Sequence, residues 1–225
     1  RQIRRLIEKT ARSKAFTLIL GESGVGKEVV AREIHRLSSR ADGPFVAINC
    51  ASIPEGLIES ELFGHEAGAF TDAHHKHAGA FEQANNGTLL LDEVAELSLS
   101  AQPKLLRALE GNEITKVGGE KCSTFNTRVV AATNKDLKAL CRSGEFRSDL
   151  YYRLSIIEIP IPPLRRRPAD IGVLAEHFLR ELIAGYNVAV YRITEGGLAA
   201  LQRHDWPGNG RELKHIIERS LVFTT

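Results

Sequence analysis

Long apolar runs, paired cysteines and a strong charge of either sign are all missing from this sequence of 225 residues. Because no run of about 18 apolar residues occurs and the N-terminus lacks a signal-peptide pattern, neither a membrane-spanning helix nor secretion is indicated. Cys50, Cys122 and Cys141 form no CxxC pair, which argues against a zinc site and favours free thiols in a reducing compartment. The net charge of +2 gives no general attraction to nucleic acid or to a membrane surface.

The composition that is present is that of an ordinary soluble protein. Hydrophobic residues make up 43% and charged residues 26% of the chain. The length suits one large and one small domain. The chain begins at Arg1, ends at Thr225 and contains no methionine, for which no physical reason is evident. We therefore expect it to be the central piece of a longer protein.

Apolar strands and helical patterns alternate through the first 160 residues. Strands are expected at 16–20, 44–49, 88–94, 128–133 and 156–161, and helices at 29–37, 52–63 and 102–110, with part of a hairpin at 114–119. This alternation predicts an α/β fold with a mostly parallel five-stranded sheet flanked by helices.

Four prolines within residues 160–168 mark a domain boundary, because proline stops regular structure and stiffens a connector. Helices are expected beyond it at 170–184, 194–203 and 210–222, with Thr194 as the N-cap of the second. The predicted domains are an α/β domain at 1–163 and a small helical domain at 164–225. The three arginines at 165–167 are interpreted as solvated, or as facing acidic groups of a neighbour, in preference to a nucleic-acid patch.

A glycine-rich loop connects the first expected strand to the first expected helix, which is the order found in a phosphate-binding P-loop. Its residues are Gly21, Glu22, Ser23, Gly24, Val25, Gly26, Lys27 and Glu28. The glycines allow positive φ values and close approach of the backbone to phosphate, and the backbone N–H groups form an anion cradle at a helix N-terminus. Lys27 can reach the β- and γ-phosphates. The alternative, a glycine-rich turn with a surface lysine, is disfavoured by the flanking strand and helix.

An apolar strand that ends in two acids supplies the second half of a nucleotide-hydrolysing site. Asp92 and Glu93 follow Leu89, Leu90 and Leu91, and ligands of open α/β sheets bind at the carboxyl ends of the strands. Asp92 is expected to hold Mg²⁺, mainly through its waters, and Glu93 to act as general base towards the attacking water.

Three further segments make the chain resemble one known family. They are 79–88, 146–154 and 206–213, which read Gly-Ala-Phe-Glu-Gln-Ala-Asn-Asn-Gly-Thr, Phe-Arg-Ser-Asp-Leu-Tyr-Tyr-Arg-Leu and Trp-Pro-Gly-Asn-Gly-Arg-Glu-Leu. With the glycine loop, Glu28 included, they resemble the central AAA+ ATPase domain of the sigma-54-dependent transcriptional activators over nearly the whole chain. The resemblance implies an AAA+ P-loop NTPase fold with a small C-terminal helical lid domain. It also implies Mg²⁺-dependent hydrolysis of ATP, a homo-oligomeric ring, expected to be a hexamer, and a bacterial cytoplasmic location.

The resemblance assigns roles to two asparagines and to an arginine of the lid. Asn134 would lie near the γ-phosphate or the attacking water as a first sensor, although it is also placed to cap a helix that starts near residue 135. Asn49 would hydrogen-bond Glu93 and hold it away from water. Arg211 would reach the nucleotide of its own subunit as a second sensor, and the alternative for it is an ion pair with Glu212 or Glu218.

Arg147 and Arg153 resemble arginine fingers that reach the γ-phosphate bound by the adjacent subunit. Such an arginine offsets the charge that develops on the transferred phosphoryl group. On one ideal helix the two side chains would point about 240° apart, so they need not act as a single fork. The alternative is that they are surface arginines paired with Glu145 and Asp149.

The segment 68–73 resembles the loop with which the family contacts sigma-54. It consists of Gly68, Ala69, Phe70, Thr71, Asp72 and Ala73. Phe70 is expected as an exposed apolar anchor at the tip. Asp72 stands where the family has glycine, which removes backbone freedom and adds a negative charge. His74, His75 and His77 follow, and we interpret them as plain polar residues in preference to a metal site. Gly210 is a second departure from the family, in the lid.

Two functions of different classes remain open at this point. The first is an ATP-driven ring that remodels sigma-54 RNA polymerase to open promoters. The second is an ATP-gated oligomerisation module that acts on a partner other than sigma-54. Direct DNA binding by this chain is disfavoured by its near-neutral charge and by the absence of a recognisable helix-turn-helix. The resemblance implies that DNA is contacted only by a domain outside this sequence.

Overall fold

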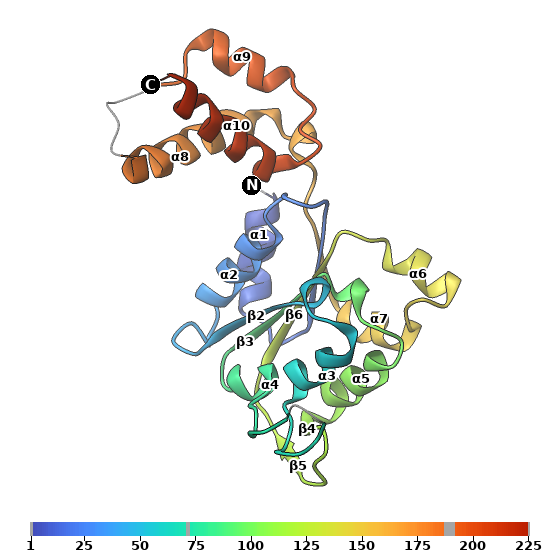
Figure 1. The fold of residues 1–225 in the computed structure, drawn as a ribbon. Helices are drawn as coiled ribbons and strands as arrows, with labels where there is room; N and C mark the ends of the chain where they lie inside the picture. Colours follow the sequence, from blue (N-terminus) through green and yellow to red (C-terminus); the bar gives the residue numbers. More distant parts are fainter. Residues whose placement is uncertain (1, 71–72, 187–191, 225) are drawn as a thin grey trace. The chain divides into compact units, whose positions relative to one another are not determined.

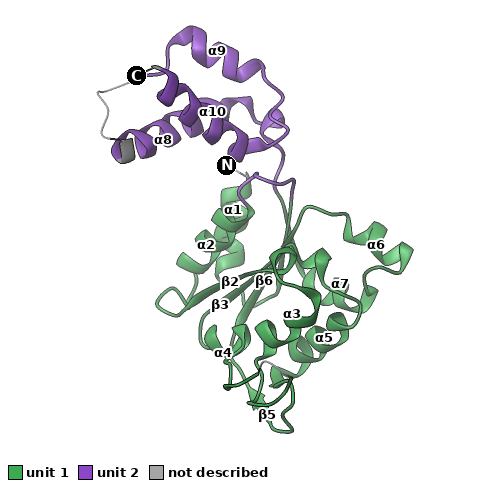
Figure 2. Cartoon of the chain, viewed as in Figure 1, with its two compact units in different colours: residues 1–20, 27–160 green, residues 21–26, 161–225 purple. Residues whose placement is uncertain are grey.

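The computed structural model describes residues 2–70, 73–186 and 192–224, and the chain forms two compact units (Figure 2). Unit 1 comprises residues 1–20 and 27–160, and unit 2 comprises residues 21–26 and 161–225. The glycine loop at 21–26 therefore belongs to the second unit, whereas Lys27, which follows it directly, belongs to the first. No helix among the described residues has the length and apolar character needed to cross a membrane.

The centre of unit 1 is a parallel sheet of five strands (Figure 1). Its strands, in spatial order, are β2 (Phe45–Asn49), β3 (Thr88–Asp92), β6 (Arg128–Thr133), β1 (Thr17–Leu20) and β7 (Ile157–Pro160). All five expected strands are confirmed, and so is the α/β fold class. Strands β1 and β6 are buried almost throughout, because helices cover both faces of the sheet.

Helices α1 (Gln2–Ala11) and α2 (Lys27–Arg36) pack against each other and against the sheet, as Figure 1 shows. The remaining helices of unit 1 are α3 (Glu55–Phe63), α4 (Ala80–Gln83), α5 (Ala101–Gly111), α6 (Leu137–Ser143) and α7 (Ser148–Leu154). Two short 3₁₀ helices follow strands, η1 (Cys50–Ser52) and η2 (Val94–Glu96). The expected hairpin is formed by β4 (Glu113–Thr115) and β5 (Cys122–Thr124), which pair antiparallel.

Successive side chains along each strand point to opposite faces of the sheet, and this alternation builds the core of unit 1. Leu89 and Leu91 of β3 join a fully buried cluster with Leu105 of α5 and Leu150 of α7. Leu90, between them, is buried as well although it points to the opposite face of the sheet. β3 is therefore apolar on both sides through its middle, and Asp92 is the polar residue at its carboxyl end, where the candidate site lies.

The described residues of unit 2 form the helices α8 (Pro168–Tyr186), α9 (Glu195–Arg203) and α10 (Asn209–Thr224), preceded by the short helix η3 (Leu164–Arg166). The expected helices of the second domain are confirmed, and Thr194 caps α9 by accepting a hydrogen bond from Gly197 N. Trp206 is 1% exposed and lies in a core with Leu164 and Leu213. Its indole N–H donates to Leu201 O, so the ring is buried without an unsatisfied polar atom.

Candidate nucleotide site

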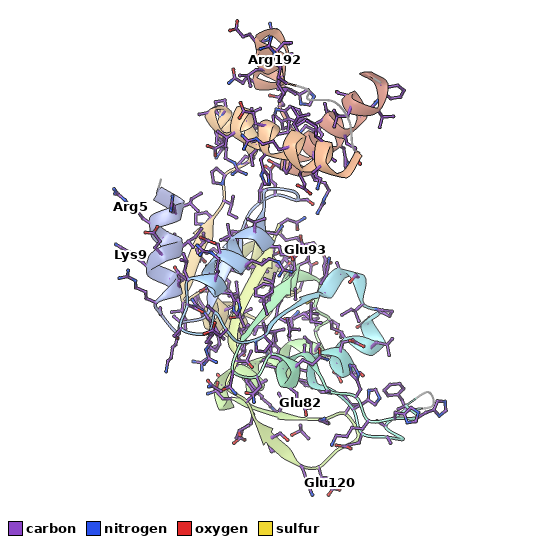
Figure 3. The ribbon with its side chains drawn as sticks, turned by 90° about the vertical axis from the view of Figure 1, so that its left-hand side faces the viewer. Arg5, Lys9, Glu82, Glu93, Glu120 and Arg192 are labelled. Atoms are coloured by element: carbon purple, nitrogen blue, oxygen red, sulfur yellow. The ribbon has the colours of Figure 1, made fainter. Side chains whose placement is uncertain are left out.

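The register of the sheet brings the polar strand ends together. Asn49 lies opposite Asp92 on the neighbouring strand, and Leu20 of β1 lies opposite Thr133 of β6. Because parallel strands all end at the same edge, Asn49, Asp92 and Thr133 occupy one edge of the sheet, the edge at which open α/β sheets bind ligands. Glu93, labelled in Figure 3, follows directly after β3.

Glu93 has a left-handed backbone, with φ 50° and ψ 47°. This backbone conformation is uncommon for residues other than glycine, and the strain persists where surrounding contacts enforce it. Glu93 N donates to Asp92 Oδ1 at 3.0 Å. Its carboxylate accepts from Lys27 Nζ at 3.1 Å through Oε1 and from Asn134 N at 3.2 Å through Oε2. Three groups thus hold one acid at the strand edge.

The Lys27–Glu93 ion pair is shielded from water, with side-chain exposures of 6% and 18%. Lys27 is the first residue of α2, directly after the glycine loop. A buried ammonium needs an anionic partner, because desolvation of an unpaired charge is costly. Here the partner is Glu93, the residue expected to act as the general base.

Asp92 is half-buried, and its carboxyl pKa is raised, first by burial and then by the adjacent charge of Glu93. Two carboxylates side by side offer hard oxygen donors, and a divalent cation would relieve the repulsion that raises this pKa. The donor set therefore fits Mg²⁺. The first residue of η1, Cys50, is buried next to them, and burial together with the Asp92 charge raises its thiol pKa to about 12.

The two asparagines of the strand edge differ from expectation in their side-chain contacts. Asn134 does not cap the following helix: the N-cap of α6 is Asp136, whose carboxylate accepts from Lys138 N and Ala139 N. The Asn134 side chain is exposed, and its backbone N–H contacts Glu93. Asn49 Oδ1 accepts from Ala51 N and so caps η1. Two of the expected catalytic residues therefore adjoin Glu93, one through its backbone and one through the register of its strand.

The two candidate fingers occupy different environments. Arg147 precedes α7 as its N-cap, so the angle expected for two positions on one helix does not apply. Its guanidinium forms a fork with Asp149, with Nε–Oδ1 at 3.1 Å and Nη2–Oδ2 at 2.7 Å, which confirms the pairing considered as the alternative. Arg153 turns inward instead. Its Nη2 donates to Leu109 O at 2.8 Å, its guanidinium carbon lies 5.1 Å from the centre of the Phe16 ring, and its Nε is buried without a partner.

In unit 2 the glycine loop is held by residues that sequence reasoning missed. Arg165 binds Glu22 through two hydrogen bonds of 2.6 and 2.8 Å, and Asn209 Nδ2 donates to Glu22 Oε2 and to Ser23 O. These contacts lower the Glu22 pKa to about 2, Arg165 contributing most. Arg165 therefore faces an acid of its own chain and not one of a neighbour. No local pattern predicts these pairs, because they join residues more than 140 positions apart.

The loop has the backbone that phosphate binding requires. Gly24 and Gly26 have φ values of 77° and 100°, and a Cβ on Gly24 would overlap the carbonyl oxygen of Gly208. Val25 is buried. Arg211 Nη1 donates to Ser23 Oγ at 3.0 Å, and both residues line a pocket of about 470 Å³ in unit 2. Residues 21–26 of the expected loop and Arg211, the expected second sensor, are thus brought together within one unit.

Glu28 takes no part in these loop contacts. It is exposed on α2 and pairs with Arg32 at 2.7 Å. Gly21 is also closely packed, because a Cβ there would lie 2.9 Å from Val25 Cγ2 and 3.0 Å from Ile161 O. Gly21 therefore belongs to the closely packed backbone of the loop, whereas Glu28 presents a solvated side chain on α2.

The segment 68–73 begins at a glycine with φ 82° and closes through a hydrogen bond from Gly68 N to Ala73 O. Phe70 is half-buried, and its ring contacts that of His65 edge-on at 4.9 Å, so it is less exposed than expected, and its role as a partner-binding anchor stays a prediction. The expected partner-binding residues Thr71 and Asp72 lie outside the described residues. No group of three or more metal-ligating side chains occurs in the described part of the chain.

The comparisons with known proteins agree with this geometry. Residues 1–160 match the family model of the sigma-54 interaction domain, and residues 165–225 match that of the AAA+ ATPase lid domain. The DNA-binding transcriptional activator HyfR of Escherichia coli K12 is 50% identical over 97% of this chain and 32% of HyfR. The anaerobic nitric oxide reductase transcription regulator NorR of Aeromonas hydrophila is 50% identical over 99% of this chain and 44% of NorR. The chain thus spans less than half the length of either relative.

A solved structure resembles the chain over almost its whole length. NtrX from Brucella abortus, crystallised in complex with ATP, superposes with a TM-score of 0.92 at 39% identity, covering 99% of this chain and 48% of NtrX. NtrX has also been crystallised with ADP, and that structure gives the same TM-score. From the family match across both units and from this fold, we conclude that the chain belongs to the sigma-54 interaction domain family of AAA+ proteins and ends in that family's lid domain.

Proposed function

We propose that this chain hydrolyses ATP at a site completed by a second copy, and that it uses the cycle to remodel sigma-54 RNA polymerase. The observation that carries the proposal is the Lys27–Glu93 pair at the sheet edge. A buried lysine directly after a glycine loop is poised to exchange its carboxylate partner for phosphate oxygens. That exchange would release Glu93 when the substrate arrives.

Each candidate residue then has a role in the proposed reaction. The backbone N–H groups of 21–26 and the Lys27 ammonium bind the β- and γ-phosphates. Asp92 holds Mg²⁺ largely through water, and the bound metal neutralises phosphate charge. Glu93 accepts a proton from the attacking water as the water oxygen bonds to the γ-phosphorus, with Asn134 beside it to orient that water. The bond between the γ-phosphorus and the β–γ bridging oxygen breaks, and that oxygen leaves with ADP. The products are ADP and inorganic phosphate.

Residues further from the acid pair would report the state of the site. Arg211 of the lid reaches the phosphates from the same subunit, and Asn49 exchanges its present cap on η1 for contact with Glu93. Arg147 and Arg153 are proposed to act on the nucleotide of the adjacent copy in a ring, expected to be a hexamer. Of the two, Arg147 is exposed and needs only to leave Asp149, whereas Arg153 would first have to leave Leu109 O.

The output of the cycle is proposed to be movement of the 68–73 loop, which contacts sigma-54. Its base is joined to the β4–β5 hairpin, because Glu66 N donates to Val117 O and Val117 N donates to Gly64 O. DNA contact would come from a domain outside this sequence, and the proposed location is the bacterial cytoplasm. The alternative is an ATP-gated assembly module with another partner, which Asp72 favours because it replaces a loop glycine with a charge.

The test compares the chain with Lys27→Ala and Glu93→Gln variants in an assay of phosphate release at rising protein concentration. We expect specific activity to climb with concentration, Lys27→Ala to lose nucleotide binding, and Glu93→Gln to bind ATP but to turn over at least about 100-fold more slowly. Full activity of a dilute monomer would contradict the shared site. Retention of sigma-54 with a transition-state mimic of ATP separates the proposal from the alternative, for which no retention is expected.

A further inference from the structure

Gln102 is a buried polar residue that the proposed reaction does not yet use. It lies in the first turn of α5 with 0% exposure, among leucines and alanines of the core. Its carboxamide makes three hydrogen bonds. Nε2 donates to Leu97 O at 3.0 Å and to Glu145 O at 3.1 Å, and Oε1 accepts from Arg147 N at 2.8 Å.

Only an amide of this length satisfies all three partners. Two carbonyl oxygens require two donors on one atom, and the Arg147 N–H requires an acceptor on the opposite side of the same group. A glutamate would present oxygen to both carbonyls, and a leucine would leave all three backbone groups unpaired. Because Gln102 and its bond to Leu97 O are buried, water cannot replace that bond, and the other two bonds are partly buried.

The three hydrogen bonds orient the Gln102 carboxamide towards Arg147. Leu97 follows η2, the short helix that begins after Glu93, and Glu145 lies just before the finger segment. These two carbonyls fix the plane of the amide, so that Oε1 points at Arg147. Arg147 is the N-cap of α7 with an extended backbone, φ −76° and ψ 131°, and no side chain caps the helix at this position. The Gln102 bond is therefore what anchors the finger's own backbone N–H.

We propose that Gln102 is a positioning residue that places Arg147 for the nucleotide of the adjacent copy. The inference rests on the proposed function, in which Arg147 acts across the seam. Gln102 fixes where the arginine starts, while the exposed guanidinium stays free to exchange Asp149 for phosphate. A 1 Å displacement of a catalytic group can cost about 100-fold in rate, so a fixed starting point matters for turnover.

The first experiment measures steady-state ATP hydrolysis by the assembled chain with Gln102→Leu, Gln102→Glu and Arg147→Ala. Leu105→Ala is the matched control, because Leu105 is also a fully buried residue of α5 and belongs to the apolar core. We expect both Gln102 variants to lower kcat roughly 10- to 100-fold and to change KM for ATP by less than about twofold. In a double variant with Arg147→Ala, the Gln102 change should cost nothing further.

The second experiment mixes variant protomers, because a residue with a merely structural role would give no recovery of activity in such a mixture. Glu93→Gln protomers lack the base but present an intact finger, and Gln102→Leu protomers have an intact base. If Gln102 acts through Arg147, sites that combine the two are complete, and the mixture should exceed the summed activities of its components at least about fivefold. No recovery would place the effect of Gln102 in its own nucleotide site and overturn the inference.

An Arg147→Ala plus Glu93→Gln mixture serves as the reference. If this reference also fails to recover, the shared site itself is wrong and the Gln102 inference falls with it. If only the Gln102 mixture fails, the inference alone is overturned. Thermal melting identifies variants that do not fold, and the Gln102→Glu protein, which keeps an acceptor for Arg147 N, provides a second mixture if Gln102→Leu is unfolded.

Discussion

Glu93 holds a left-handed backbone at a cost of roughly 1–3 kcal/mol, and its contacts explain how. Asp92 accepts its N–H, while Lys27 and Asn134 hold its carboxylate. The place of the two acids after an apolar strand is predictable from sequence, because it follows from local pattern alone. The lysine partner is not, because it lies 66 positions away and depends on how helix and strand pack.

The reactivity of the Cys50 thiol is a prediction about a single residue. Burial and the charge of Asp92 raise its thiol pKa from 9.0 to about 12, so its thiolate fraction near pH 8 falls about a thousandfold. We expect a maleimide to leave Cys50 unmodified while it labels Cys122, which is exposed on the β4–β5 hairpin. Mass spectrometry of peptides after timed labelling measures both rates. Equal rates for the two thiols in the folded protein would contradict the burial of Cys50.

At the scale of elements, α1 is a helix that the sequence analysis did not predict. Its last turn is held by Arg128 of β6, which donates from Nη1 to Ala11 O and from Nη2 to Thr10 O. A guanidinium suits this position, because the final carbonyls of a helix lack partners and carry partial negative charge. Arg128 is only 4% exposed, and burial lowers its pKa to about 10. The capping residue comes from more than a hundred positions away, so no local signal marks the end of α1.

Replacing Arg128 tests this long-range cap. We expect Arg128→Met to lower the free energy of unfolding by about 2–4 kcal/mol, because two buried carbonyls lose their donors. Arg4→Met is the control, since Arg4 is 86% exposed on the same helix and its pair with Glu8 is worth less than about 1 kcal/mol. Urea titration followed by circular dichroism gives both values. Similar losses for the two variants would show that the cap contributes no more than an exposed ion pair on α1.

The elements that sequence predicted share a physical reason. Strands such as β3 and β6 are runs of apolar residues between turn signals, and α9 starts at a recognisable cap, Thr194. All of these are encoded within a few residues. The contacts of Arg147, Arg153 and Glu22 are not, because each depends on side chains brought together by the tertiary fold. The sequence therefore predicted which residues stand in the candidate site better than it predicted what they touch.

Considered as whole units, the second unit has an ion pair that joins its helices to its glycine loop. The Glu22 pKa is lowered from 4.5 to about 2 by Arg165 and Asn209. Because the folded pKa is below the unfolded one, this contribution is fully present above pH 4.5 and is lost as pH falls through about 2. We expect Arg165→Ala to flatten the fall in stability between those values, as measured by urea titration at stepped pH. An unchanged pH profile would show that the pair contributes nothing measurable.

The 68–73 loop makes a prediction for the assembled molecule. Phe70 rests against His65, so Phe70→Ala removes an apolar surface without touching the sheet edge. We expect this variant to keep ATP hydrolysis within about twofold and to lose promoter opening by sigma-54 polymerase, since hydrolysis and partner contact use separate residues. Asp72→Gly, which restores the family's residue, is the matched comparison. Opening that persists in Phe70→Ala would show that the loop is assigned wrongly.

The fork between Arg147 and Asp149 has a consequence for how copies would recognise one another. In an isolated copy the guanidinium is already neutralised by an internal anion, so an incoming nucleotide must win a competition. A terminal phosphate carries roughly twice the charge of a carboxylate and is favoured in that exchange. In a diphosphate the charge lies one phosphate further from the arginine, so a diphosphate would lose the competition with Asp149. The contact between copies would thus depend on the number of phosphates, and it would be stronger before ATP is cleaved than after cleavage.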